Sequence, residues 1–333
     1  MEKKYYGALN GLRMIAALGI VLFHIKATTE YQITGYAYEK VITSFSNFVF
    51  LFMIISAFSM CCGYYDKILN NQLSFSKFYS KRFKKILPFY SIIVLLEIIT
   101  SPSIASLYEG FADFTLLFGF LPDTLSFSVV GVGWFLGLIF VFYLVFPFFC
   151  VLLENKRRAW IAFAISLIYN FACINYFHVG KSNILYSACF FLAGGLIYLY
   201  RDKIEKINQW LALLFVVVSI VSYYVFGRNI YLCLLVCITL LIYAVTTKGK
   251  ILNNSVTKFF SNISLEIYLS HMAMFRIIEK INLVYLFGDG WLQYAITSII
   301  VFCCATAFAF VMHKLIEFVI CKTENFRLRK QNN

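Results

Sequence analysis

Two ionisable side chains, Arg13 and His24, lie eleven residues apart within one apolar stretch, Ala8 to Ala27. At about 100° per residue, this spacing returns to within roughly 20° of the same helix face, with a rise of about 16 Å. A charged group on a transmembrane helix costs several kcal/mol unless it faces a paired or water-filled interior. The spacing therefore predicts a polar stripe through much of the membrane's depth, which is the first candidate site.

His24 is the member of this pair that could perform acid-base chemistry. Histidine is the side chain whose unperturbed pKa, about 6.5, lets it take and release a proton near neutral pH. His24 lies near the end of this apolar stretch, where it could act as a general base on a hydroxyl group arriving from outside the cell. A structural alternative is equally open: His24 extends to the interface, and Arg13 pairs with a lipid phosphate or a carbonyl group.

A second polar face occurs late in the chain, where Ser264, Tyr268 and His271 are spaced i, i+4, i+7. This spacing places hydroxyl, phenol and imidazole on one side of a helix. At about 1.5 Å per residue, His271 lies at roughly the level of His24, so the two histidines are expected to share one pocket. The alternative role for these residues is hydrogen bonding between packed helices.

A basic cluster at 80–88 contains Arg82 and Lys85 and stands at the start of a third apolar stretch. Arginine and lysine at such a mouth could hold a polyphosphate. A cluster that only sets membrane topology would look the same.

Two further residues are candidates for the site. Glu97 lies inside an apolar stretch and needs a partner, for which Arg13 is the expected cation. Trp134 begins a later stretch, where an aromatic residue is typical of the membrane interface, although an indole there could also stack on a sugar ring.

The composition places these residues in an integral membrane protein. Hydrophobic residues make up 61% of the 333 residues and charged residues only 14%, which is more apolar surface than a soluble domain could bury. The net charge of +13 falls in short clusters between apolar stretches, so nucleic-acid binding is not expected. The ten cysteines form no CxxC pattern, and no metal site is expected.

Apolar runs of about 20 residues predict an all-α, polytopic membrane bundle of about ten transmembrane helices in a single domain, 1–333. The predicted spans are 8–27, 45–64, 83–100, 131–153, 159–177, 184–200, 210–226, 229–246, 259–278 and 292–320. Basic residues concentrate in the loops after the second, fourth, sixth and eighth spans and at the C-terminus, which predicts cytoplasmic termini. An apolar piece at 111–121 is too short to span and is expected to be re-entrant or interfacial.

Together these residues resemble the acyltransferase-3 family of membrane acyltransferases over nearly the whole chain. The family pattern of a basic residue, ten intervening residues and a histidine is met by Arg13 and His24. An RxxR-like element before a proline is approximated by 82–85, and a late SYxxYLxH-like element by 264–271. The chain differs from the family pattern at three places: Ala57 in a Ser-Gly-Phe motif, Lys85 for the second arginine, and 131–136 in place of His-Leu-Trp-Phe-Leu.

The resemblance implies an enzyme of the bacterial cytoplasmic membrane that transfers acetyl from acetyl-CoA to a sugar hydroxyl of a surface glycan or a lipid-linked oligosaccharide. The phosphates of the donor would bind Arg82 and Lys85, with the pantetheine arm passing Arg13 toward His24. No esterase-like domain follows in this sequence, so transfer is expected to be direct or to a separate protein. The residues assigned are, for catalysis, Arg13, His24 and His271; for the donor, Arg13, Ser56, Arg82, Lys85 and Tyr268; for the acceptor, Glu97, Trp134 and Ser264.

A transporter or flippase for an acyl group or a lipid-linked sugar is the main alternative, because buried charge in ten spans also suits a carrier. The chain shows no internal repeat and contains only four prolines, which argues against broken helix pairs. A membrane scaffold and a glycan polymerase are further alternatives. The oligomeric state, including a homodimer, is left open.

Overall fold

The computed structural model describes residues 4–121 and 127–331, with side chains described as far as Thr323. Within these residues the protein is helical and contains no strand, which confirms the all-α prediction. The helices are α1 (Ala8–Thr28), α2 (Phe48–Leu69), α3 (Phe75–Thr100), α4 (Ile104–Thr115), α5 (Trp134–Glu154), α6 (Lys156–Asn175), α7 (Ile184–Leu199), α8 (Arg201–Ile204), α9 (Gln209–Val225), α10 (Ile230–Thr246), α11 (Ser255–Asn262), α12 (Ser264–Lys280) and α13 (Trp291–Gln331).

Nine of the ten predicted spans each overlap one of these α-helices, whereas the span 259–278 is divided between α11 and α12 at Ile263. Five segments are long and apolar enough to cross a membrane by length and composition: Ala8–Thr28, Ala37–Leu69, Trp134–Glu154, Lys156–Asn175 and Trp291–Thr323. Helices α7, α9 and α10 are apolar but shorter. The structure therefore supports a multi-pass membrane protein, and the number of ten spans stays a prediction.

Asparagine caps five of the six helices from α6 to α11. The side chains of Asn155, Asn183, Asn208, Asn229 and Asn254 accept hydrogen bonds from backbone N–H groups in the first turns of α6, α7, α9, α10 and α11. The first four N–H groups of a helix have no partner within it, so each cap satisfies a donor that would otherwise be lost. These caps fix where the second half of the bundle turns.

Helix α1 lies at the centre of the bundle, where it packs against α2, α10, α11, α12 and α13. Its neighbour α2 in turn approaches α7 closely at Gly194, where an added Cβ would lie 2.4 Å from the backbone oxygen of Ile54. Nearby, the rings of Phe50 and Phe190 stack at 4.1 Å between centroids. Small residues at such crossings let backbones approach, as is typical of membrane helices.

The segment after α3 folds back as α4 and a 3-10 turn, Leu117–Phe120, instead of continuing as a helix. The turn packs on α5, where an added Cβ on Gly119 would lie 2.5 Å from the oxygen of Gly137. This is the region expected to be re-entrant or interfacial. It forms a hairpin that covers the start of α5.

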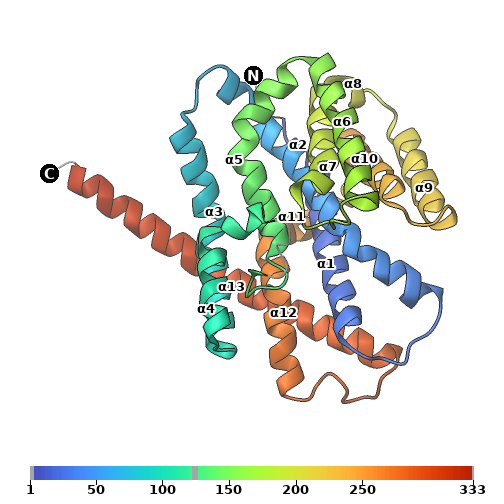
Figure 1. Cartoon of the computed structure of the whole chain (residues 1–333), viewed down its shortest axis with the longest axis vertical. Coiled ribbons are helices and arrows are strands. Elements are labelled where there is room, and N and C mark those ends of the chain that lie inside the picture. The colour runs from blue at the N-terminus through green and yellow to red at the C-terminus, as the bar shows by residue number, and fades with distance from the viewer. Residues whose placement is uncertain (1–3, 122–126, 332–333) are drawn as a thin grey trace.

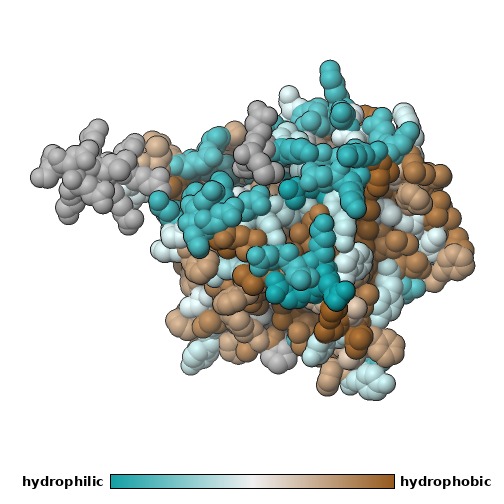
Figure 2. Space-filling view, turned by 90° about the horizontal axis from the view of Figure 1, so that it is seen from above, coloured by the Kyte–Doolittle hydropathy of each residue, from teal (hydrophilic) through white to brown (hydrophobic). Residues whose placement is uncertain are grey.

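Hydrophilic residues gather at the end of the bundle seen in Figure 2, whereas hydrophobic residues cover much of its flank. The last helix, α13, has 41 residues and extends well past the bundle (Figure 1). The predicted span 292–320 was already too long for one crossing, and the structure continues that helix to Gln331.

Candidate active site

The structure brings His24 of α1 and His271 of α12 together. Their ring centroids lie 5.0 Å apart with the planes tilted by 51°. His271 is fully buried, whereas His24 is half-buried and makes no ring hydrogen bond within the described part of the chain. A half-buried imidazole thus lies next to a fully buried one.

The hydrogen bond of His271 fixes which of its nitrogens carries the proton. Nδ1 lies 2.6 Å from the backbone oxygen of Tyr268. A carbonyl oxygen only accepts, so Nδ1 donates, and Nε2 of the neutral ring keeps a free lone pair. Nε2 is buried and has no partner among the described residues. Nε2 is therefore the one acceptor position that this ring has available.

Tyr268 and the loop before α5 hold this arrangement. The Tyr268 hydroxyl donates to the backbone oxygen of Val132 at 2.7 Å, and its ring meets that of Phe135 edge-on at 5.3 Å. Ser264 lies seven residues before His271 on α12, where its hydroxyl donates to the oxygen of Ser261 at 3.0 Å. Tyr268 thus anchors α12 to the loop before α5, whereas the Ser264 hydroxyl is bound at the start of α12, away from the imidazoles.

Arg13 turns toward α2. Its Nη2 donates to the hydroxyl of Ser59 at 2.7 Å. Ser56, the α2 serine assigned to the donor from the sequence, makes no hydrogen bond in the described part of the chain. Ser59 is one turn further along α2, and only its i+3 position relative to Ser56 could have indicated it.

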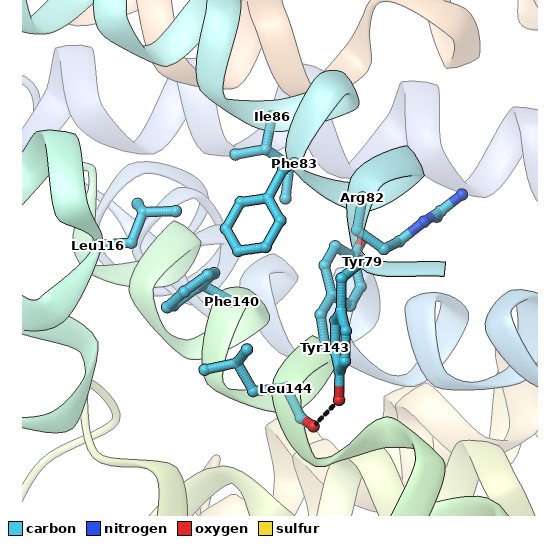
Figure 3. A pocket seen from close by; sticks show the side chains of 8 residues that line it. All are labelled: Tyr79, Arg82, Phe83, Ile86, Leu116, Phe140, Tyr143 and Leu144. Atoms are coloured by element: carbon cyan, nitrogen blue, oxygen red, sulfur yellow. Dashed lines mark hydrogen bonds between the residues drawn. The ribbon is translucent and has the colours of Figure 1, made fainter. Parts of the chain in front are cut away.

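Arg82 of α3 is held by aromatic residues. It donates to the hydroxyl of Tyr64 and to the sulfur of Met60, and its guanidinium lies 4.7 Å from the Tyr64 ring centroid and 5.6 Å from that of Tyr143. Figure 3 shows the Arg82 side chain extending away from the apolar lining of Phe83, at a cavity of about 10 Å³, room for about one water molecule. Its buried Nε has no partner among the described residues.

Lys85 lies on the same helix, one turn further into the bundle. It is exposed, although Arg13, Arg82 and Glu266 all act on it electrostatically. The charges of Arg13 and Arg82 both act on Lys85, so these three side chains form one cationic region.

The expected pairing of Glu97 with Arg13 is wrong. Glu97 is 4% exposed and forms an ion pair with Arg276 of α12. Glu97 follows Lys85 by twelve residues on α3, about 18 Å along the axis, so it lies far from the level of Arg13. The ion pair sits near His271, on which the charge of Arg276 acts.

Trp134 is buried, at 6% exposed, and its ring is approached by a cation from the loop between α6 and α7. The Lys181 ammonium lies 5.7 Å from the Trp134 ring centroid. Trp134 thus does not offer an open face for a sugar in this structure. Nothing in the position of Lys181 in the sequence marks it as part of the site.

Asp113, which is fully buried, ties the hairpin after α3 to the loop that precedes α5. One carboxylate oxygen accepts from the hydroxyls of Tyr90 and Ser128, both at 2.8 Å, and the other accepts from the N–H groups of Val129 and Val130. Burial raises the pKa of Asp113 to about 6, against the effect of these hydrogen bonds.

A larger cavity, of about 490 Å³, is lined by Tyr64, the residue that binds Arg82, but not by Arg82 itself. The charged side chains in its lining include the cations Lys67 and Arg201 and the carboxylates Asp66 and Asp202. Its volume lies within the range of small-molecule sites in proteins. Among the described residues, no group of three or more His, Cys, Asp or Glu side chains could hold a metal ion.

Comparison with known proteins gives one match. A family model described as an acyltransferase domain matches residues 6–312 of the chain. No curated protein and no solved structure matches it.

Proposed function

The chain belongs to the acyltransferase-3 family of membrane acyltransferases, and we propose that it transfers acetyl from cytoplasmic acetyl-CoA to a hydroxyl of a bacterial surface polysaccharide or its lipid-linked precursor. Membership of this family makes the chain a membrane acyltransferase in general terms and does not favour the transporter alternative. The donor, the acceptor and the bacterial cytoplasmic membrane are parts of the proposal.

One observation carries the proposal: two imidazoles from separate helices face each other at 5.0 Å, and one has a buried nitrogen free to accept a proton. Acyl transfer to an alcohol needs a base at the hydroxyl, because an un-ionised hydroxyl is a weak nucleophile. Ser and Tyr side chains on α12 are engaged in hydrogen bonds to backbone oxygens, so the imidazoles are the groups available for this role.

In the proposed reaction, His24 takes the proton of the acceptor hydroxyl while the oxygen attacks the thioester carbonyl carbon. The carbon–sulfur bond of the resulting tetrahedral intermediate then breaks, and the thiolate of CoA takes the proton back from the imidazolium. His271 lies beside His24 and can share the proton through its free Nε2. The products are the acetyl ester and CoA, and the enzyme is returned to its starting state.

The cationic region formed by Arg13, Arg82 and Lys85 fits the donor. Its charges would bind phosphate oxygens, for which arginine is well suited. The 490 Å³ cavity shares Tyr64 with Arg82 and is large enough to receive the nucleotide part of CoA. In this proposal the acetyl group passes between α1, α3 and α12 to reach the histidines.

The test is ester formation by purified protein in liposomes with acetyl-CoA and an extract of surface glycan. We expect His24→Asn and His271→Asn each to lower ester formation by at least about 100-fold, the usual range for a general base. His178→Asn is the matched control, since His178 is exposed and has a φ of 50°, which asparagine accepts. Wild-type ester formation in both histidine variants would refute the proposal, and unmodified glycan crossing the bilayer would favour a transporter.

A further inference from the structure

Lys181 lies in the loop between α6 and α7, and its ammonium lies over the ring of Phe23, the residue before His24. Its ammonium is 5.9 Å from the ring centroid of Phe23 and 5.7 Å from that of Trp134. The ring of Phe23 in turn contacts that of His24, with centroids 5.1 Å apart. The charge of Lys181 acts on His24 directly.

The ammonium is only partly satisfied. It has three N–H donors, and one of them binds the backbone oxygen of Ser46 at 3.3 Å. No carboxylate pairs with Lys181 anywhere in the described chain, whereas Arg276, the other cation near the histidines, is paired with Glu97. Burial lowers the pKa of Lys181, which is what a half-buried cation without a counter-ion should show.

We propose that Lys181 binds an acidic group, a carboxylate or a phosphate, on the acceptor and thereby holds the neighbouring hydroxyl at His24. The inference rests on the proposed function and adds a property of the acceptor: it is an anionic sugar. An anion here would supply the counter-ion that the protein does not, and would draw the ammonium away from the indole of Trp134.

A different role for Lys181 makes a different prediction. The same ammonium could stabilise the oxyanion of the tetrahedral intermediate, in which case the donor alone would need it. Hydrolysis of acetyl-CoA by water forms that oxyanion without any sugar. A variant that lacks the charge therefore separates the two roles: loss of acceptor preference supports our proposal, and loss of hydrolysis overturns it.

The experiment uses three probes that differ at one carbon of the same sugar: glucose, glucuronate and glucose 6-phosphate. Binding to the full-length protein in lipid nanodiscs is measured by titration calorimetry at constant ionic strength. We expect the wild type to bind at least one acidic sugar about tenfold or more tightly than glucose, Lys181→Met to remove this preference, and Lys181→Arg to retain it. Comparison of glucuronate with glucose 6-phosphate shows whether a carboxylate or a phosphate is preferred.

Lys40→Met is the matched control, since Lys40 is exposed in the segment between α1 and α2; it should keep the wild-type preference. A wild type without any preference, or a preference that survives in Lys181→Met, overturns the inference. Release of CoA thiol from acetyl-CoA without sugar is followed in parallel, and any such release should be unchanged in Lys181→Met. Ester formation on the surface-glycan extract is measured separately: if the wild type forms no ester, the proposed function fails, while the binding comparison still decides the role of Lys181.

Discussion

Ser59 illustrates how one hydroxyl can direct a cation. Its oxygen accepts from Arg13 at 2.7 Å and holds the guanidinium toward α2. A hydrogen bond to a charged group contributes about 1 to 3 kcal/mol. We expect Ser59→Ala to lower kcat/KM for acetyl-CoA roughly fivefold or more, chiefly through KM, because Arg13 would no longer be oriented toward the donor.

Ser56→Ala is the control for this prediction, measured in the same steady-state assay. It should stay within about twofold of the wild type, because Ser56 makes no hydrogen bond in the described chain. The assignment of Ser56 to the donor from the sequence predicts the reverse order. A larger loss in Ser56→Ala than in Ser59→Ala would therefore favour the sequence-based assignment.

The sequence predicted which side chains lie close together better than it predicted which side chains pair with each other. Helix counting was enough to bring His24 and His271 to one level, because both lie on regular helices of known rise. It failed for Glu97, whose depth on α3 separates it from Arg13. Lys181 could not be found, since a loop side chain has no periodicity from which its direction could be inferred.

Asp113 connects a whole element to the site, because its carboxylate ties α4 to the loop that begins α5. Its pKa in the folded protein, about 6, exceeds the ordinary value of 3.8. The folded state thus binds this proton more tightly, and the free energy of unfolding falls as the pH rises from about 4 to 6 and is level above that. The shift corresponds to about 3 kcal/mol.

Asp113→Asn should remove this dependence, so the difference in Tm between wild type and variant should change between pH 4 and 6 and stay constant from pH 6.5 to 8. Thermal unfolding in detergent at several pH values measures this difference. Parallel Tm profiles for the two proteins would contradict the assigned pKa.

The contact between α2 and α7 depends on one glycine. At Gly194 an added Cβ would meet the oxygen of Ile54 at 2.4 Å and Cβ of Ala57 at 2.8 Å. Backbone cannot yield cheaply, so Gly194→Ala should destabilise the protein by about 1 to 3 kcal/mol. Gly63 in α2 has open space around its Cβ position, so Gly63→Ala should be neutral or stabilising by up to about 1 kcal/mol.

Thermal unfolding of both variants tests this prediction. Equal Tm values for Gly194→Ala and Gly63→Ala would show that α2 and α7 are less closely packed than described.

The sequence predicted both helices but not their contact, because a glycine in an apolar run does not reveal which partner approaches it. For 101–121 the sequence predicted an apolar segment too short to cross the membrane. It did not predict that this segment forms a hairpin on α3 and α5, because that arrangement depends on tertiary contacts.

For the whole molecule, the helical class followed from composition and periodicity, and the family model covering 6–312 agrees with the resemblance read from the motifs. The number of crossings did not follow from them. Helices α3 and α12 carry charges within their length, and α7, α9 and α10 are short. Whether such helices cross depends on their neighbours, which cover polar groups and allow tilt.

The proposed topology, ten spans with both termini in the cytoplasm, makes a prediction for every loop. Alkaline phosphatase folds only outside the cytoplasm, so fusions after Gly35, Gly180, Gly227 and Gly288 should be active, and fusions after Asn70, Asn155 and Gly249 should be inactive. The reason is the distribution of Lys and Arg, which cluster in the loops containing Asn70, Asn155 and Gly249. Fluorescent-protein fusions at the same positions should give the opposite pattern. An active phosphatase fusion after Asn70 would reverse α2, place Arg82 outside, and leave the cationic region without access to cytoplasmic acetyl-CoA.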